Sequence, residues 1–402
     1  MDDPYFSAEA VIAPWHDEPY EPMESLVSRR IGPVQELREW VDADINLRRV
    51  VALGTAVDRV HGEITPVVGV GRSTCGSMAR TRAMGEFIER LTLMEPPKAL
   101  VDPRRGARDG HCPLDEAWVE AVDLATGVTT PRAASDYYVH PASCPTSQRS
   151  DRPSTNGTAA GHTLASATER ALLELLERDA LMTMWRYRLR SPVVEPDLRT
   201  RCEAKESGLQ CRFLDLSWIH GVPTVVCVTD GWYGGQRVRA VGSACDRSFP
   251  DAGLRALRES IAAHSMCVDW LADDYGGPLD FSSFAHNAFY HLDGAHMEFA
   301  DSCEPAAEHA PGAWQLAGHP QEVVDGLVSR LARRQIAVYA VDISSPTLRK
   351  LGWHTAALRS PDLYPLEVGF GDRSLAERMR AHPCRVELKV ADQINLVPVP
   401  LA

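Results

Sequence analysis

Three glutamates in this chain each stand 17 residues after a glycine, and each closes the same short pattern. The pattern has five positions: Arg, then Ala, then either Leu or Met, then any residue, and finally Glu. The three glycine and glutamate pairs are Gly69 and Glu86, Gly157 and Glu174, and Gly242 and Glu259. Because a shared register over such gaps is hard to obtain by chance, we interpret the segments as three diverged copies of one unit, each a strand, a tight Gly turn and a helix.

The helices expected in the first two copies carry acids and arginines on one face. Helical residues three or four positions apart share a face. The aligned sets are Arg82, Glu86, Glu89 and Arg90 in the first copy, and Arg170, Glu174, Glu177 and Arg178 in the second. The third copy has Ala262 and Ala263 where the others have the second glutamate and its arginine. A solvated salt-bridge stripe is the simplest alternative for one helix, but its recurrence on otherwise apolar helices favours a functional face.

These repeated charges predict a site for a nucleotide with magnesium. If the copies pack with the charged faces inward, four carboxylates and several guanidiniums meet in one cavity, which requires divalent cations for the acids and an anion for the arginines. Mg²⁺ takes one or two carboxylates with phosphate oxygens, Arg pairs bidentately with phosphate, and a Gly turn can hold phosphate on its amides. The sequence has no Walker loop, and Thr74 replaces the last Gly of a dinucleotide fingerprint, so the site is of another construction.

Composition and charge restrict the class of function. The 402 residues are 44% hydrophobic and 24% charged, which is typical of a soluble globular protein. A formal net charge of −13 argues against a nucleic-acid or anionic-membrane surface. The ten cysteines include no Cys-x-x-Cys, so neither a zinc ribbon nor a redox motif is expected. An acidic N-terminus and the lack of a long apolar segment lead us to expect a cytoplasmic protein.

The chain order predicts a lead-in followed by one large domain. Residues 1–46 are rich in Pro, Trp, Tyr and acids and contain one short helical candidate, Val34–Val41. Residues 47–402 are expected to form the domain. Within it, residues 274–318 hold four histidines among acids, Gly and Pro. Their spacing matches no standard metal-ligand set, so we expect a surface insertion or lid there.

The fold class expected for this domain is α+β, with sheets and helices packed around a central ATP/Mg²⁺ cavity. A β-hairpin is predicted to end in the strand Val238–Ala244 and to lead into a helix from Asp251 to Asp273. The other expected elements are strands at Arg49–Ala56, Ile64–Val70, Phe213–Leu216, Pro223–Thr229 and Ala337–Ile343, extended pieces near Ala117–Asp123 and Tyr137–His140, and an amphipathic helix at Gln321–Arg334. Two prolines exclude regular structure in the C-terminal tail.

Two motif blocks in this order resemble the YcaO family. The segments that carry the likeness are Ser154–Gly161 followed by Glu174–Ala180, and the earlier Gly85–Arg90. They are similar to the ATP-binding motifs of that family, which include Ser-x3-Glu-x2-Glu-Arg and Arg-x3-Glu-x2-Gln. The likeness extends from about Ser25 to the C-terminus. The resemblance therefore covers nearly all of the chain.

The resemblance implies an enzyme that uses ATP to phosphorylate a backbone amide oxygen of a ribosomally made precursor peptide. In the cyclodehydratase branch a Cys, Ser or Thr side chain of the substrate attacks the amide, and loss of phosphate gives a thiazoline or oxazoline. Because the attacking group belongs to the substrate, the enzyme needs no nucleophile of its own and acts mainly by charge stabilisation at the phosphate. ATP and Mg²⁺ are the implied cofactors.

The resemblance also implies roles for particular residues. Three glutamates would take part in catalysis, namely Glu86, Glu174 and Glu259. Magnesium would be held by Glu86, Glu89, Glu174 and Glu177, and the nucleotide would be bound by Arg90, Ser154, Asn156, Arg178 and Arg255. The sequence departs from the family pattern at three places. Arg82 occupies the position of the first motif's Ser, Ala262 replaces the Gln of the last motif, and a Pro-x-Pro-x-Pro tail is shortened to Pro398 and Pro400.

Partners and alternatives follow from the same resemblance. The residues before the first strand are too few for a leader-binding or ThiF-like domain, so a separate protein is expected to supply it. A flavin dehydrogenase is a further candidate partner, no nucleic acid or membrane is expected, and a homodimer is left open. Two other functions also stay open: a YcaO-type enzyme that forms a thioamide or an amidine, and a non-catalytic YcaO-like scaffold.

Overall fold

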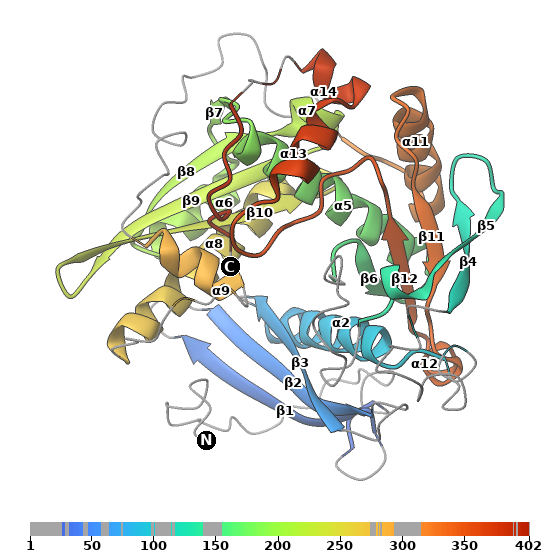
Figure 1. Cartoon of the computed structure of the whole chain (residues 1–402). Helices are drawn as coiled ribbons and strands as arrows, with labels where there is room; N and C mark the ends of the chain where they lie inside the picture. Colours follow the sequence, from blue (N-terminus) through green and yellow to red (C-terminus); the bar gives the residue numbers. More distant parts are fainter. Residues whose placement is uncertain are drawn as a thin grey trace. The chain divides into compact units, whose positions relative to one another are not determined.

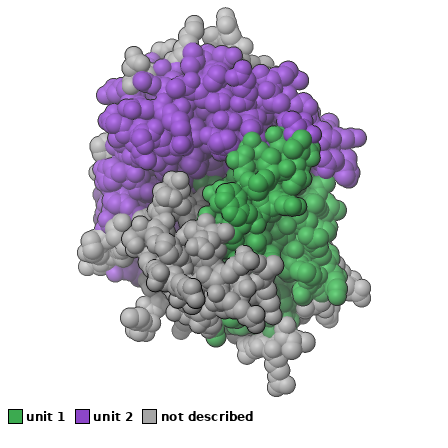
Figure 2. All heavy atoms as spheres, turned by 45° about the vertical axis from the view of Figure 1, so that its right-hand side comes forward, with its two compact units in different colours: residues 1–123, 127–170, 339–359 green, residues 124–126, 171–338, 360–402 purple. Residues whose placement is uncertain are grey.

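The chain divides into two compact units, which Figure 2 shows in different colours. The computed structural model describes residues 26–28, 32–42, 47–57, 64–73, 75–97, 100, 114, 117–139, 155–273, 279, 281, 284–292, 315–388, 390 and 393–401. Unit 1 comprises residues 1–123, 127–170 and 339–359, and unit 2 comprises residues 124–126, 171–338 and 360–402.

A three-stranded antiparallel sheet with one long helix forms the first part of unit 1 (Figure 1). Its strands are β1 (Val34–Asp42), β2 (Leu47–Val57) and β3 (Ile64–Ser73), in that spatial order. The helix α2 (Gly76–Met94) follows directly and packs on the sheet. The core between them contains Val50, Ala52, Val67, Ala83, Phe87 and Ile88. The predicted strand pair and the first glutamate helix are confirmed.

A five-stranded antiparallel sheet forms the second part of unit 1. Its spatial order is β5-β4-β11-β12-β6, so strands from distant parts of the chain lie side by side. The strands are β4 (Trp118–Asp123), β5 (Thr129–Ala133), β6 (Thr158–Gly161), β11 (Tyr339–Asp342) and β12 (His354–Arg359). Short helices η1 (Ala134–Asp136) and α12 (Pro346–Lys350) flank it in sequence. The extended piece predicted near Ala117–Asp123 is β4.

Unit 2 is built on a four-stranded antiparallel sheet in the order β10-β9-β8-β7 (Figure 1). Its strands are β7 (Val193–Val194), β8 (Gln210–Asp215), β9 (Thr224–Tyr233) and β10 (Gln236–Cys245). The hairpin of β9 and β10 turns at Gly234 and Gly235, which both have positive φ, and β10 leads into α8 (Phe249–Ala272) as predicted. The strand pattern of period two was therefore sufficient to place this hairpin.

Unit 2 contains further helices. The segment Leu164–Arg186 forms α5, which begins in unit 1 and continues into unit 2. The others are α6 (Leu198–Glu206), α7 (Ser217–His220), α9 (Phe284–Tyr290), α11 (Pro320–Arg333), α13 (Arg373–Arg380) and α14 (Pro383–Glu387). In the described part of the chain, no helix is long and apolar enough to cross a membrane.

The C-terminal tail is irregular, as its prolines predict, but it is buried in unit 2. Val399 and Leu401 are almost completely buried, and Leu401 makes a parallel bridge with Val241 of β10. The Trp185 Nε1–H donates to the Val397 carbonyl at 2.8 Å. The tail therefore belongs to the core that α5 and β10 share.

Two predicted elements are wrong. Val34–Val41 is not a helix but strand β1, because its backbone pairs with β2 and this tertiary pairing overrides an apolar spacing compatible with a helix. Tyr137 and Tyr138 are not extended, because both backbone N–H groups donate to the Ala134 carbonyl in a tight turn after η1. His140 lies outside the described residues.

The tight Gly turn expected in each copy is wrong for the first and third copies. Gly69 and Gly242 lie inside strands β3 and β10. A Cβ on Gly69 would lie 2.2 Å from the Ala83 carbonyl oxygen, and one on Gly242 would lie 2.4 Å from the Ala256 carbonyl oxygen. Glycine is needed here because the helix packs directly on the strand backbone. Only Gly157, with φ of 67°, has the conformation of a turn.

Gly242→Ala is expected to destabilise the protein by roughly 3 kcal/mol, because the new methyl group would force α8 away from β10. The matched control is Gly253→Ala within α8, where a Cβ meets nothing within 4 Å. That control should stabilise the helix by up to about 1 kcal/mol. Urea unfolding measures both free energies. Equal unfolding midpoints for the two variants would contradict the close approach of helix and strand.

Candidate functional site

The three copies make matching hydrogen bonds between helix and strand. In unit 1 the Val70 N–H donates to the Glu86 carboxylate at 2.7 Å, and in unit 2 the Ser243 N–H donates to the Glu259 carboxylate at 3.1 Å. The arginine of each copy donates to the carbonyl ten residues earlier. These bonds join Arg82 to Arg72 at 2.7 Å, Arg170 to Ala160 at 3.5 Å and Arg255 to Cys245 at 3.2 Å. The equal offsets support the interpretation as one repeated unit, which stays an interpretation.

Unit 2 gathers charged residues of two copies. Glu177 is buried on α5 and accepts hydrogen bonds from the Ser243 hydroxyl at 2.7 Å and from the Cys245 N–H at 3.1 Å, both on β10. Arg178 follows it, with its Nη1 3.4 Å from the Glu177 carboxylate and its Nε 3.8 Å from that of Glu174. Strand β10 thus fixes the Glu177 carboxylate beside the Arg178 guanidinium. The unit 2 cluster is the name used here for five residues: Glu174, Glu177, Arg178, Arg255 and Glu259.

Arg178 is held as a cation inside this cluster. Burial alone would lower its pKa, but the carboxylates of Glu177, Glu259 and Glu174 outweigh burial, and the pKa lies above its ordinary value. Its Nε and Nη1 atoms are buried and have no hydrogen-bond partner in the described part of the chain. A buried donor without an acceptor is costly. The cluster is therefore suited to receive an anion at Arg178.

Burial also acts on the carboxyl group of Glu259. Burial raises its pKa to about 7; Arg178 acts in the opposite direction, whereas the charge of Glu177 adds to the rise. Helix α8, the helix of the third copy, also carries Arg255, which donates to the Asp246 carboxylate at 2.9 Å. Burial would lower the pKa of Arg255, but Asp246 and Glu177 raise it above its ordinary value. At neutral pH Glu259 is thus close to its midpoint of ionisation.

The raised pKa of Glu259 predicts a pH-dependent stability. Since its pKa is about 7 in the folded protein and near 4.5 when unfolded, the folded state holds the proton more tightly between these values. The free energy of unfolding should therefore fall by up to about 3 kcal/mol as the pH rises from 4.5 to 7. Urea unfolding across this range should show the slope, and Glu259→Gln should remove much of it. An unchanged slope in that variant would contradict the assignment.

The predicted residues of the first copy lie in unit 1. The Arg90 guanidinium contacts the Glu86 carboxylate at 2.5 Å and donates to the Val68 carbonyl at 2.8 Å, while Glu89 is half-buried on the same helix. Asn156 is buried, and its backbone carbonyl accepts a hydrogen bond from Arg359 at 2.6 Å. Ser154 lies outside the described residues.

The structure thus brings together five of the predicted site residues, the unit 2 cluster. The predicted meeting of the first two glutamate helices across a cavity stays a prediction, because Glu86 belongs to unit 1 and Glu174 to unit 2. Among the residues described, no group of three or more His, Cys, Asp or Glu side chains is arranged to hold a metal ion. One or two carboxylates suffice for Mg²⁺ when phosphate supplies further oxygens.

Sequence reasoning missed two residues of this site. Ser243 fixes Glu177 through its hydroxyl and Glu259 through its N–H, and Asp246 pairs with Arg255. The repeat contains a signal for the position of Ser243, because Ser243 follows Gly242 just as Val70 follows Gly69. The type of residue at this position does not reveal its role as a backbone donor, since every residue except proline has an N–H.

The donor set of the unit 2 cluster fits phosphate with a divalent cation. The two guanidinium nitrogens of Arg178 without acceptors suit phosphate oxygens, with which Arg forms strong charge-assisted hydrogen bonds. Hard oxygen ligands such as carboxylates are those that Mg²⁺ prefers, and Glu174 and Glu177, three residues apart on α5, both lie beside Arg178. The main support for this fit is the pair of buried donors, Nε and Nη1 of Arg178, because a bound anion would accept hydrogen bonds from both.

Comparisons with known proteins agree with this fit. The family model described as YcaO cyclodehydratase, ATP- and Mg²⁺-binding, matches residues 70–363. Among solved structures, a heterocyclase in complex with substrate and cofactor is similar with a TM-score of 0.68 and 19% identity; the match covers 94% of this chain but only 57% of the heterocyclase. Among curated proteins, no sequence matches the chain.

Two further solved structures share the fold. The YcaO protein from Methanopyrus kandleri bound with AMPPCP and Mg²⁺ matches with a TM-score of 0.56 and 19% identity over 91% of both chains. A chain of the E. coli microcin synthetase McbBCD complex with pro-MccB17 bound matches with a TM-score of 0.58 and 14% identity, over 81% of this chain and 88% of that one. This protein therefore shares its mixed arrangement of sheets and helices with both of these structures.

Proposed function

The chain belongs to the YcaO family, and from this membership we propose that it is an ATP-dependent cyclodehydratase acting on a ribosomally made precursor peptide. The cofactors are ATP and Mg²⁺, as the family model describes. The proposed product is a thiazoline or oxazoline ring, formed from a Cys, Ser or Thr residue of the substrate. The solved structures named above support heterocyclase chemistry, and the exact reaction is our proposal.

One observation carries the proposal: Arg178 has two buried donors without acceptors beside three carboxylates. Such a group can bind phosphoryl oxygens and stabilise charge on them, which is the main demand of phosphoryl transfer. Glu177 would stay in place because Ser243 and Cys245 fix both of its oxygens. Bound Mg²⁺ would neutralise phosphate charge, and Glu174 and Glu177 are the residues of unit 2 that would hold it.

The reaction balances without a nucleophile from the enzyme. The substrate's thiol or hydroxyl loses its proton and forms a bond to the carbon of the preceding amide, and the amide oxygen takes the γ-phosphoryl group as the bond from the γ-phosphorus to the oxygen of ADP breaks. The carbon–oxygen bond then breaks, phosphate leaves, and the former amide nitrogen becomes the imine nitrogen of the ring after loss of its proton. The net change is loss of one water from the peptide with conversion of ATP to ADP and phosphate. What the enzyme's residues do is bind the phosphates and stabilise their charge.

A separate leader-binding or ThiF-like protein is the partner we propose. One comparison supports it, because a chain to which this one is similar is part of the McbBCD complex. Neither the leader-binding protein nor a dehydrogenase is identified by the fold of this chain. The proposal predicts that the partner raises the rate at which the precursor is processed.

Mass spectrometry of the precursor tests the function. The protein is incubated with its precursor, ATP and Mg²⁺, with and without the candidate partner. We expect loss of the mass of one water per ring, together with ATP turnover. Exchange of an oxygen for a sulfur would instead identify a thioamide-forming enzyme. ATP turnover with an unchanged precursor mass would overturn the cyclodehydratase, and no metal-dependent nucleotide binding would leave only the scaffold.

A further inference from the structure

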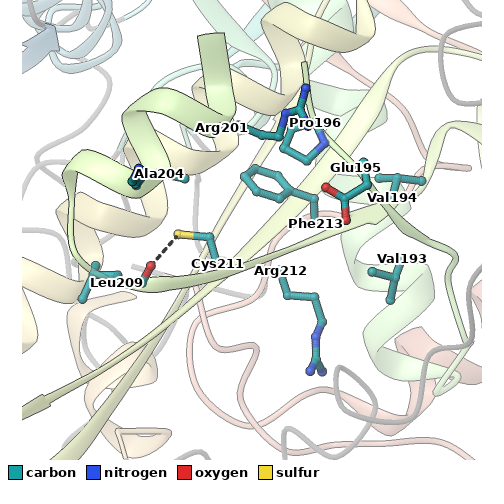
Figure 3. Close-up of a pocket in the computed structure, with 11 residues that line it drawn as sticks. Val193, Val194, Glu195, Pro196, Arg201, Ala204, Leu209, Cys211, Arg212 and Phe213 are labelled. Atoms are coloured by element: carbon teal, nitrogen blue, oxygen red, sulfur yellow. Dashed lines mark hydrogen bonds between the residues drawn. The ribbon is translucent and has the colours of Figure 1, made fainter. Parts of the chain in front are cut away.

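A groove of about 320 Å³ lies in unit 2 between helix α6 and the edge of the sheet (Figure 3). One wall is the face of α6 that carries Arg201, Ala204 and Lys205, which share a side because they are three and four residues apart. The other wall is the end of β7 together with the start of β8. No residue of the unit 2 cluster lines it, so it is a different site from the proposed ATP site.

The groove exists because the edge strand stops early. β7 pairs with β8 only through Val193 with Leu214 and Val194 with Phe213. In the same register Pro196 would lie opposite Cys211, but proline has no N–H to donate, and the chain leaves the sheet there. Asp197 then caps α6 by accepting from the N–H groups of its first turn. The edge of β8 before Phe213 is thus left without a neighbouring strand in the described chain.

The backbone of Cys211 faces this open edge. The Asp215 N–H donates to the Pro192 carbonyl on the β7 side, whereas the Leu216 N–H donates to the Thr224 carbonyl on the β9 side. Because backbone groups alternate along a strand, the N–H and carbonyl of Cys211 point to the same side as those of Asp215. An extended segment entering the groove can therefore add a strand to β8 at Cys211, the mode of binding used at exposed sheet edges.

Positive charge lines the groove although the whole chain carries −13. Arg201, Lys205 and Arg212 contribute three cations, and Glu195 is the acid that lines it. In the described part of the molecule neither Arg201 nor Lys205 forms an ion pair, and both are exposed. Two cations held on one helix face beside an open strand edge favour a peptide that carries carboxylates.

We propose that this groove binds an extended, acidic segment of the precursor peptide, which adds a strand at Cys211 and places carboxylates against Arg201 and Lys205. The identity of the peptide rests on the proposed function, whereas the binding chemistry rests on the groove alone. A segment held here leaves the rest of the same peptide free to reach the site of ring formation. The groove is then a specificity site, not a catalytic one.

Cys211 provides a reporter inside the groove. Its Sγ lies 3.6 Å from the Leu209 carbonyl oxygen, and the thiol is half-buried (Figure 3). Hydrogen bonding to Cys227 lowers the pKa of Cys211 more than burial raises it, and alkylation of this thiol by iodoacetamide is the readout. Cys227 itself is buried with a pKa well above its ordinary value, so its thiol should stay unreactive. A strand bound at Cys211 should protect only Cys211.

The test uses a fluorescent peptide of alternating Glu and Val residues and a matched peptide of alternating Lys and Val. We expect the acidic peptide to bind the full-length protein and to slow alkylation of Cys211, and the basic peptide to do neither. The double variant Arg201→Glu, Lys205→Glu should weaken binding at least about tenfold. Arg199→Glu is the control, because Arg199 is on the same helix but not in the groove.

Three results would overturn the proposal: equal binding of the two peptides, unchanged affinity in the double variant, or alkylation of Cys211 that the acidic peptide does not slow. The occupant is tested separately with the precursor, for which the double variant should raise KM and leave kcat unchanged. An unchanged KM together with intact binding of the acidic peptide would exclude the precursor and point to an acidic segment of a partner. Failure of ring formation in the unmodified protein would contradict the proposed function while the peptide assay still stands.

Discussion

Glu177→Gln is expected to lower ATP turnover by about a hundred- to a thousandfold, the loss typical when one well-placed electrostatic group is removed from such a site. The Glu177 carboxylate is fixed by Ser243 and Cys245 and lies 3.4 Å from the Arg178 guanidinium. Gln keeps the size of the side chain but removes the charge that a divalent cation would need. Nucleotide affinity should then lose its dependence on Mg²⁺, which calorimetry with a non-hydrolysable ATP analogue measures.

The matched control is Glu377→Gln on α13. Glu377 is a helical glutamate that also pairs with an arginine, Arg373, but both of these side chains are more than half exposed. Its substitution should change turnover less than twofold, because exposed ion pairs contribute only about 0–1 kcal/mol. Urea unfolding separates a loss of function from a loss of fold in Glu177→Gln. Turnover close to that of the unmodified protein would show that Glu177 is not part of the ATP site.

The local pattern was sufficient to predict much of unit 2. Helices α5 and α8 were found from apolar spacing, and the hairpin of β9 and β10 from alternation and its Gly-rich turn. The spacing of 17 residues singled out Glu174 and Glu259, which the structure brings near the same arginine. Period and turn chemistry are properties of neighbouring residues, so a single sequence contains them.

Other features depend on contacts that a single sequence does not show. Strand β1 was missed because its conformation is set by pairing with β2 and not by its own apolar spacing. The sequence pattern predicts turns at the glycines of the first and third copies, although Gly69 and Gly242 are needed for close packing of a helix on a strand. In both cases the local sequence is compatible with two backbone conformations, and contact with a neighbouring element decides between them.

A buried charge network beside the unit 2 cluster was also invisible in the sequence. Asp179, the residue after Arg178, contacts the Arg385 guanidinium 206 residues later in the chain, and its other oxygen lies 2.8 Å from His220 Nε2. Arg334 donates to His220 Nδ1 at 3.1 Å, so Nε2 carries the ring proton and donates to Asp179. Burial lowers the pKa of His220 more than Asp179 raises it, which keeps the ring neutral at pH 7.

The charge of Asp179 is stabilised by these partners. Burial alone would raise its pKa, but Arg385, His220 and the Tyr364 N–H outweigh burial and hold the pKa below its ordinary value. Because the folded pKa lies below the unfolded one, this contribution to stability is complete above the unfolded pKa and is lost as the pH falls through the folded pKa. The network joins α5 to α14 and so fixes the turn of α5 that carries Glu177.

Asp179→Leu is therefore expected to destabilise the protein by about 3–5 kcal/mol, because Arg385 is almost fully buried and would be left without its carboxylate. Urea unfolding measures the loss. The double variant Asp179→Leu, Arg385→Leu should be no less stable than the single one, since a buried pair replaced by apolar side chains leaves no uncompensated charge. Glu377→Leu in the exposed pair with Arg373 is the control and should cost less than about 1 kcal/mol. Equal losses for Asp179→Leu and Glu377→Leu would show that the buried network does not hold α5 in place.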